Sequence, residues 1–246
     1  MNLILLEPNE VSDQGEVSLS GTRAEHLLKV LKVQTGQNVR IGILDGPCGI
    51  GTVAAVSNGA VELRCAVETV VSPRPRVDIL LALPRPKVMR RLWAQLAALG
   101  VGQIIITNAE RVERNYFDTH VLSPACYHPL LVEGLQQAKD TRVPKVSIHR
   151  QFKVLVEDEL DTLFRSGLRL VANPSAAEPV APVVRESVEE RILLAVGPEG
   201  GWNSFETDLL AAHGFRPVGM GPRTLRADTA CVALLTLVHD AMRCRV

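Results

Sequence analysis

The stretch that decides the fold reads Ile192-Leu-Leu-Ala-Val-Gly-Pro-Glu-Gly-Gly-Trp-Asn203. Its five leading apolar residues predict a strand buried on both faces, and the glycines that follow predict a tight loop. Asn203 with Glu206 three residues later is a capping-box pattern, so a helix is expected to begin there and to end at His213-Gly214. A buried strand, a Gly-rich loop and a helix in this order are typical of an open parallel α/β sheet.

The loop over residues 197–201 lies beyond the carboxyl end of a strand, where open α/β sheets bind ligands. Its residues do not suit a phosphate, because Pro198 lacks a backbone N–H, Glu199 is negative, and residues 192–215 contain no Lys or Arg. A neutral or cationic ligand such as the sulfonium AdoMet fits better, and a tight structural turn is the alternative. Trp202 is expected to pack beside the helix start rather than to stack on a base.

A second strand-to-helix turn reads Val218-Gly-Met-Gly-Pro-Arg-Thr-Leu-Arg-Ala-Asp-Thr-Ala230. Two such turns can form two walls of one pocket, into which Arg223, Arg226 and Asp228 are expected to project. Two arginines beside a pocket can hold RNA phosphate or stabilise negative charge that develops on a base. The alternative is an Arg–Asp pair that only holds the loop.

Ser72-Pro-Arg-Pro-Arg76 is the expected boundary between two domains, 1–72 and 73–246, because its prolines stop any helix or strand from running through. Before it, short strands and one helix that begins with a Thr22-Arg-Ala-Glu25 capping box predict a small β-barrel. These strands are expected at about 2–6, 16–19, 38–44, 50–56 and 60–69.

After the boundary, strands alternate with helices, which predicts a parallel sheet with helices on both faces. The strands are expected at 77–83, 104–107, 146–149, 168–172 and 192–196. The helices are expected at 88–99, about 128–139, about 152–165 and about 229–243, the last capped by Asp228 or Thr229.

Composition narrows the class of protein. With 46% apolar and 22% charged residues the chain is ordinary for a globular protein, and the absence of a long apolar run predicts a cytoplasmic protein without a membrane segment. The five cysteines form no CxxC pair and the histidines have no ligand spacing, so no metal site is expected. Residues 73–114 carry eight Lys and Arg residues and three acidic residues. These basic side chains could bind a phosphate backbone or form a solvated helix face.

Several motifs together resemble the RsmE family, SPOUT-superfamily enzymes that methylate N3 of a uridine in 16S ribosomal RNA of the small subunit. They are Gly197-Pro-Glu-Gly-Gly-Trp202, Glu206, Gly214-Phe215 and Met220-Gly-Pro-Arg-Thr-Leu-Arg-Ala-Asp-Thr-Ala230. His26-Leu-Leu-Lys-Val-Leu-Lys32 is similar to a helix of the family's N-terminal barrel, and Leu81-Ala-Leu-Pro with Leu99-Gly-Val resembles the start of its catalytic domain. The resemblance is densest over 192–235 and extends over the whole chain.

The resemblance implies an α/β fold with a C-terminal trefoil-knotted SPOUT methyltransferase domain, which contains the parallel sheet, and a small N-terminal PUA-like β-barrel that binds RNA. It also implies AdoMet as cofactor, 16S ribosomal RNA of the small subunit as partner, and a homodimer. The cofactor would lie against three loops, with contacts from Ala172, Gly197, Pro198, Glu199, Gly200, Gly201, Met220, Gly221, Leu225, Arg226, Thr229 and Ala230.

For catalysis, Arg226 is the first choice to stabilise charge on the uracil oxygens and Arg223 the second. Glu199 or Asp228 would accept the proton from N3, and the sequence leaves both open. The residues expected to contact RNA are His26, Lys29, Lys32, Arg85 and Lys87.

The chain also departs from the family pattern. Ala98 stands where the family has Glu, Lys32 where it has Arg, and the helix over 133–142 matches only loosely. These departures leave open a SPOUT enzyme with another ribosomal or transfer RNA target, or a non-catalytic RNA-binding ribosome-assembly factor. An enzyme that acts on nucleotide phosphates is disfavoured by Pro198 and Glu199.

Overall fold

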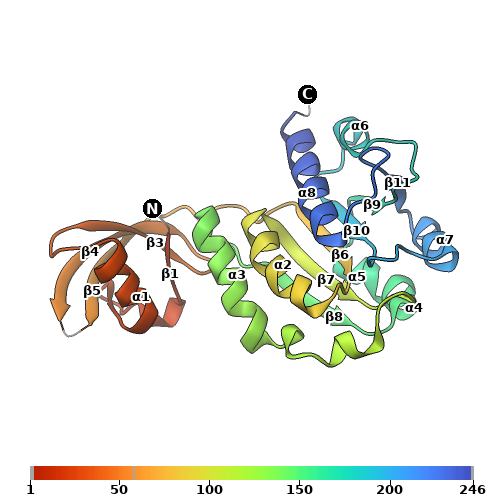
Figure 1. The fold of residues 1–246 in the computed structure, drawn as a ribbon. Coiled ribbons are helices and arrows are strands. Elements are labelled where there is room, and N and C mark those ends of the chain that lie inside the picture. The colour runs from red at the N-terminus through yellow and green to blue at the C-terminus, as the bar shows by residue number, and fades with distance from the viewer. Residues whose placement is uncertain (1–2, 58, 245–246) are drawn as a thin grey trace. The chain divides into compact units, whose positions relative to one another are not determined.

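A computed structural model describes residues 3–57 and 59–244 of the chain, which divides into two compact units (Figure 1). The first unit consists of Met1–Arg74 together with Val132–Val143, and the second of Pro75–Leu131 together with Pro144–Val246. The helix α3 (Pro124–Ala138) therefore begins in the second unit and ends in the first. The division expected from the sequence, 1–72 and 73–246, does not include this return of residues 132–143 to the first unit.

The first unit is built on a mixed five-stranded sheet in the order β1-β3-β4-β5-β2. Its strands are β1 (Ile4–Leu6), β2 (Glu16–Leu19), β3 (Asn38–Ile43), β4 (Cys48–Ser57) and β5 (Ala60–Val67). β1 pairs with β3 in parallel and the other pairs are antiparallel, and alternate residues such as Val39, Ile41 and Leu63 fill one core. The five expected strands are confirmed, although Asn2, included in the first of them, lies outside the described residues.

The helix of the first unit begins differently from the prediction. α1 (Gly21–Glu25) continues as the π-helical turn η2 (His26–Val30), and the residue before α1 is Ser20, with no side-chain cap. The expected capping box at Thr22 is therefore wrong. The positive φ of Gly21, 62°, turns the chain out of β2 one residue earlier, so that Thr22 already lies inside the helix.

Residues 132–143 belong to the first unit because their backbone is bonded to it. Leu3 N donates to Gln136 O over 3.2 Å and Asp45 N donates to Thr141 O over 2.8 Å. The buried Thr141 hydroxyl in turn donates to Gly46 O over 2.7 Å. These bonds pair polar groups that would otherwise be left without partners.

The second unit contains a six-stranded sheet in the order β11-β9-β10-β6-β7-β8, in which every pair is parallel, as predicted. Its strands are β6 (Val77–Ala82), β7 (Val101–Thr107), β8 (Lys145–His149), β9 (Leu168–Ala172), β10 (Ile192–Val196) and β11 (Arg216–Val218). All five residues of β10 are buried, and Ala195 pairs with Leu80 on one side and Val171 on the other. Parallel pairing brings the carboxyl ends of all six strands to one edge.

Helices cover both faces of this sheet, as predicted (Figure 1). On one face, α2 (Pro86–Ala98) and α8 (Ala227–Arg243) pack against each other and the sheet, and α6 (Val180–Glu186) packs against α8. On the other face lie α4 (Phe152–Val154), the π-helical turn η5 (Leu155–Glu159), α5 (Leu160–Leu163) and α7 (Ser204–Ala212). Short 3-10 turns complete the chain: η1 (Pro8–Glu10) in the first unit, and η3 (Arg114–Asp118) and η4 (His120–Leu122) in the second.

The start of α8 corrects a second prediction. α8 begins at Ala227, and its N-cap is Arg226 in an extended conformation, so neither Asp228 nor Thr229 caps it. Asp228 instead accepts a hydrogen bond from Thr229 N over 2.9 Å inside the first turn. Within the described residues, no helix is both long and apolar enough to cross a membrane.

A buried carboxyl and a half-buried arginine meet at the amino edge of the sheet. Asp78, near the start of β6, is fully buried and accepts a hydrogen bond from Arg191, just before β10. Burial raises the pKa of Asp78, and the Arg191 guanidinium offsets this rise only in part. The folded state therefore favours protonated Asp78 more than the unfolded state does. The contribution of Asp78 to the free energy of unfolding is greatest at low pH and falls as the pH rises through the raised pKa.

Replacing Asp78 with Asn tests this pair. Because the amide stays neutral, Asp78→Asn should be as stable as the wild type near pH 4 and should become more stable than the wild type as the pH rises toward 8. The measurement is urea unfolding of both proteins across that pH range. A variant that loses stability relative to the wild type as the pH rises would show that the Arg191 charge outweighs burial.

Candidate functional site

The loops that follow β9, β10 and β11 meet at the carboxyl edge of the sheet, because these three strands are neighbours. They surround a cavity of about 420 Å³, called here the loop cavity. Its lining comes from the first two loops, from the start of α7, from the residues around the start of α8 and from Arg111: Ala172, Asn173, Pro174, Ser175, Val196, Gly197, Pro198, Glu199, Gly200, Gly201, Trp202, Thr207, Thr224, Leu225, Ala227, Ala230 and Arg111.

The Gly-rich loop after β10 needs its glycines for close packing. A Cβ at Gly197 would lie 3.1 Å from Trp202 Nε1, and Gly201 has a φ of 74° that side chains rarely adopt. The Trp202 ring packs against Phe152 with 5.3 Å between ring centroids, which confirms its expected packing role, and it also lines the loop cavity. Trp202 therefore lies directly against the Gly-rich loop, and both contribute to the wall of the cavity.

The capping box at the start of α7 is confirmed. Asn203 Oδ1 accepts from Glu206 N, and Glu206 Oε2 accepts from Asn203 N, each over 2.8 Å. Glu206 is buried, and its other oxygen accepts from Glu110 N over 2.7 Å. One carboxylate thus ties the loop after β10 to the segment after β7.

Removing that carboxylate should cost stability. Glu206→Ala leaves two backbone N–H groups without their acceptor, so the free energy of unfolding should fall by about 2 kcal/mol. Glu206→Gln keeps one acceptor oxygen and should lose less. Urea unfolding of the three proteins checks this order, and equal stability of Glu206→Ala and the wild type would mean that water replaces the carboxylate at no cost.

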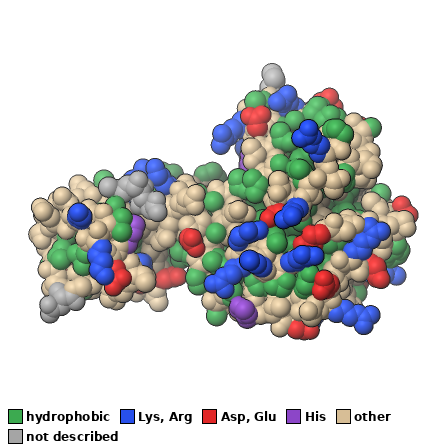
Figure 2. All heavy atoms as spheres, in the orientation of Figure 1, with side chains coloured by type: hydrophobic (Ala, Val, Ile, Leu, Met, Phe, Trp, Pro, Cys, Tyr) green, Lys and Arg blue, Asp and Glu red, His purple; other side chains and the backbone are tan. Residues whose placement is uncertain are grey.

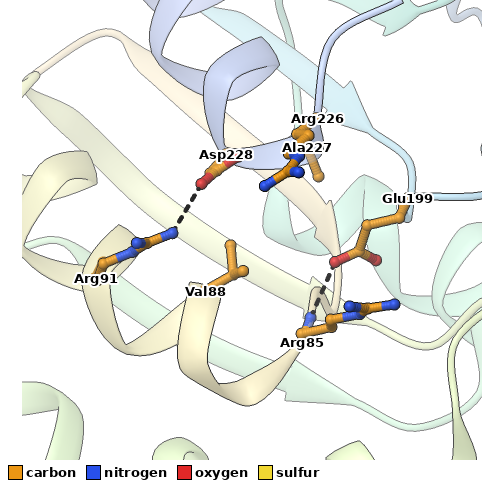
Figure 3. Close-up of a pocket in the computed structure, with 7 residues that line it drawn as sticks. All are labelled: Arg85, Val88, Arg91, Glu199, Arg226, Ala227 and Asp228. Carbon is orange, nitrogen blue, oxygen red and sulfur yellow. Dashed lines mark hydrogen bonds and ion pairs between the residues drawn. The ribbon is translucent and has the colours of Figure 1, made fainter.

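A second cavity, of about 330 Å³, lies between α2 and α8 and is called here the arginine cavity. Figure 3 shows its lining residues, which are Arg85, Val88, Arg91, Glu199, Arg226, Ala227 and Asp228. Arg226 projects its guanidinium from the start of α8 into the space between the two helices (Figure 3). Glu199 Oε1 accepts a hydrogen bond from Arg85 N over 3.2 Å, and Glu199 also lines the loop cavity. The Glu199 carboxylate therefore lies where the two cavities adjoin.

Asp228 forms an ion pair with an arginine, as considered from the sequence, but the arginine is neither Arg223 nor Arg226. Asp228 is paired with Arg91 of α2 over 3.1 Å (Figure 3), and not with Arg223 or Arg226. Within residues 3–57 and 59–244, the Arg226 side chain makes no ion pair. Its charge is therefore available to a ligand in the arginine cavity.

Two site residues were missed by sequence reasoning. Arg91 holds Asp228, and the Arg111 guanidinium donates to Gly200 O in the loop cavity. Both arginines belong to the basic segment 73–114, which was the only sign of them in the sequence. Figure 2 shows Lys and Arg side chains interleaved with acidic ones over the part of the second unit where α2 lies.

The structure brings most of the predicted cofactor residues together. The loop cavity is lined by eight of them, Ala172, Gly197, Pro198, Glu199, Gly200, Gly201, Leu225 and Ala230. A small adjoining hollow of about 50 Å³ shares Ala172, Leu225 and Ala230 with it and adds Met220, Gly221 and Arg223. Arg226 faces the arginine cavity instead, and Thr229 is exposed on α8 and lines none of these three spaces.

The residues expected to contact RNA are divided between the units. Arg85 lines the arginine cavity, and Lys87 is exposed on α2. The first unit carries the other three, His26, Lys29 and Lys32. Lys29 forms an exposed ion pair with Glu25 over 3.4 Å, and Lys32 follows η2 with a φ of 51°.

Comparisons with known proteins identify the family of the chain. The model of a family described as an RNA methyltransferase domain matches residues 72–239. Ribosomal RNA small subunit methyltransferase E of Treponema pallidum is 29% identical to the chain, over 97% of this chain and 90% of its own. Ribosomal RNA small subunit methyltransferase E 1 of Borreliella burgdorferi is 27% identical, over 95% of each.

A solved structure has a similar fold along almost the whole chain. It is a ribosomal RNA small subunit methyltransferase E from Neisseria gonorrhoeae bound to S-adenosyl methionine, with a TM-score of 0.78, 22% identity, and coverage of 98% of this chain and 97% of its own. At that identity the likeness shows the fold alone. The family model and the relatives confirm the resemblance to the RsmE family, and the chain belongs to the RNA methyltransferase family that this model describes.

Proposed function

We propose that this chain is an AdoMet-dependent methyltransferase that methylates N3 of a uridine in 16S ribosomal RNA. The observation that carries the proposal is the loop cavity, in which the Gly-rich loop after β10, the loop after β9 and the start of α8 meet beside the free guanidinium of Arg226. The names of the relatives from Treponema and Borreliella and the S-adenosyl methionine bound to the Neisseria protein support the substrate and the cofactor.

The residues of the loop cavity fit AdoMet. A volume of about 420 Å³ is within the usual range of small-molecule sites, roughly 300–1,000 Å³. Gly197, Gly200 and Gly201 leave backbone groups open to the polar atoms of an adenosine, and Leu225 adds apolar surface. Glu199 provides the negative charge that suits a sulfonium. These residues would hold AdoMet, which when bound supplies an electrophilic methyl group.

The side chains of the arginine cavity would prepare the uridine. N3 of uracil carries a proton at neutral pH, so it must lose that proton to act as a nucleophile. Arg226 would donate to a uracil oxygen and stabilise the anion, a role worth about 10²–10³-fold in turnover for a well-placed donor. Glu199 is the better proton acceptor, because Asp228 is already paired with Arg91 and bonded to Thr229 N. The proton would pass from N3 to Glu199 Oε2, since Oε1 accepts from Arg85 N.

The proposal extends to features that the resemblance implies. The domains would be 1–72, a PUA-like barrel that binds RNA, and 73–246, a trefoil-knotted SPOUT domain. The five-stranded sheet of the first unit and the parallel sheet of the second support this assignment. The enzyme would act as a homodimer on the small ribosomal subunit, and therefore in the cytoplasm.

The first experiment is calorimetric titration of the purified protein with AdoMet, S-adenosylhomocysteine and ATP. AdoMet and S-adenosylhomocysteine should bind and ATP should not, because Pro198 offers no backbone N–H to a phosphate and Glu199 would repel it. The second is transfer of labelled methyl groups to small subunits, followed by mapping of the modified base. If AdoMet does not bind, even with small subunits present, the proposal is overturned. A product other than N3-methyluridine would show that N3 of uridine is not the atom that is methylated.

A further inference from the structure

A groove of about 510 Å³ lies at the carboxyl ends of β7 and β8, outside the two cavities described above. Three segments line it: residues 108–114 after β7, residues 150–154 after β8, and the start of α7. We call it the β7–β8 groove. None of the expected cofactor, catalytic or RNA-binding residues lies in it, so the proposed function leaves it unexplained.

The walls of the groove carry three exposed cations, Arg114, Arg150 and Lys153. Within the described parts of the chain, Arg114 makes no ion pair. Arg150 pairs with Asp118 over 3.1 Å and Lys153 with Glu157 over 3.9 Å, but both cations keep more than 60% of their side chains exposed. Exposed ion pairs of this kind are weak, although Arg150 also donates a hydrogen bond to Phe117 O over 2.8 Å.

Two carboxylates also line the groove. They differ in whether hydrogen-bond donors of the protein satisfy their oxygens. Glu206 directs both oxygens to backbone N–H groups, as described above. Glu110 is exposed and is the remaining negative group among the lining residues that the structure describes. Among the lining residues three cations face two carboxylates, an excess of one positive charge, and Asp118 and Glu157, which pair with Arg150 and Lys153, lie outside the lining. This excess is compatible with an anionic ligand such as a phosphodiester backbone.

The groove also offers a surface to a base. Phe205, the second residue of α7, lines the groove and is 54% exposed, so its ring is accessible to a ligand. Asn108 Oδ1 lies buried in the lining with no hydrogen-bond partner among the described residues. An exposed aromatic ring, an amide and several cations are the combination by which proteins bind unpaired nucleotides.

The groove and the loop cavity share no lining residue, but two segments of the chain contribute residues to both. Both lie at the carboxyl edge of one parallel sheet. The segment after β7 serves both, because Arg111 lines the loop cavity while Arg114 lines the groove. Glu206, which caps α7, holds Glu110 N of the same segment. An RNA strand that presents one base to the arginine cavity could therefore pass Arg111 and Arg114 with its neighbouring nucleotides.

We propose that the β7–β8 groove binds single-stranded RNA, namely nucleotides that flank the methylated base. Phe205 stacks on one base, and Arg114, Arg150 and Lys153 contact phosphates. This inference rests on the proposed function, because it takes RNA as the substrate. It adds a binding site to the residues already expected to contact RNA, which are His26, Lys29 and Lys32 on the first unit and Arg85 and Lys87 on the second.

The test for stacking measures binding of a short fluorescein-labelled single-stranded RNA by fluorescence anisotropy. Phe205→Leu keeps an apolar side chain but loses the aromatic face, so Kd should rise roughly tenfold. Phe205→Trp keeps the face and should bind as tightly as the wild type or more tightly. Equal affinity of the Leu variant and the wild type would contradict stacking.

The test for phosphate contacts uses the salt dependence of the same binding. Arg114→Ala should lower the slope of log K against log salt by roughly 0.7, the value for one contact to a single strand. The matched control is Arg165→Ala, which removes another exposed arginine that precedes β9 and so lies at the opposite edge of the sheet. An equal loss of slope in both variants would mean that only the overall charge of the protein matters. That result would overturn the proposal that RNA binds in the β7–β8 groove.

Two further measurements distinguish a failure of the groove proposal from a failure of the proposed function. Calorimetry with AdoMet should give the wild-type Kd for Phe205→Leu and Arg114→Ala, because neither residue lines the loop cavity. If the wild type binds no AdoMet, the proposed function fails, whatever the groove does. Sedimentation should leave the oligomeric state of Phe205→Leu unchanged, and dissociation of an oligomer with intact RNA binding would assign Phe205 to a protein interface instead.

Discussion

Arg226→Ala is expected to lower the turnover of methyl transfer by about 10²–10³-fold while changing the Kd of AdoMet by less than about threefold. Arg226 makes no ion pair among the described residues and directs its guanidinium into the arginine cavity, whereas the glycines and Leu225 that would hold the cofactor line the loop cavity. The loss should therefore fall on the reacting base and not on cofactor binding.

Two other variants sharpen this expectation. Arg226→Lys keeps the charge but loses the planar fork, so it should recover only part of the turnover. Arg223→Ala removes an arginine that lines the small hollow and not the arginine cavity, so its turnover should fall much less. Single-turnover transfer to small subunits and AdoMet calorimetry are the measurements. If Arg226→Ala loses turnover and AdoMet affinity equally, Arg226 is a cofactor ligand and its electrostatic role is wrong.

The parts of the fold that follow from short-range patterns could be predicted. The apolar run 192–196 is a central buried strand, and Asn203 and Glu206 form the predicted capping box, because these features depend on residues that are neighbours in sequence. Two other local predictions failed at helix starts. Gly21 and Arg226 have backbone conformations that start the helices earlier than the polar residues at 22 and 228 suggest.

The missed contacts join residues that are distant in sequence. Arg91 and Asp228 are 137 positions apart, and Glu110 and Glu206 are 96 apart. No local pattern shows which of several arginines will meet an aspartate, since that depends on how α2 packs against α8. The excursion of 132–143 into the first unit likewise depends on hydrogen bonds, such as Asp45 N to Thr141 O, that only the folded chain forms.

Gly197→Val is expected to weaken AdoMet binding by roughly 10–100-fold, and the protein should still fold. A Cβ at this position would already lie 3.1 Å from Trp202 Nε1 and 3.2 Å from the Trp202 ring carbons. Phe152 packs against the same ring, so the indole cannot move away on that side. The added methyl groups must therefore displace the ring or the Gly-rich loop toward the loop cavity, which fills space the cofactor would need.

The matched control for this variant is Gly214→Ala, at the end of α7. Gly214 has a φ of 81° with nothing within 4 Å of an added Cβ, so the substitution should cost about 1 kcal/mol of stability from backbone strain and leave AdoMet binding intact. Calorimetry, urea unfolding and indole fluorescence compare the two. If Gly197→Val binds AdoMet as tightly as Gly214→Ala while its indole emission shows a moved ring, the Gly-rich loop is only a structural turn. Weak binding by Gly197→Val alone ties the cofactor to the wall that Gly197 and Trp202 form.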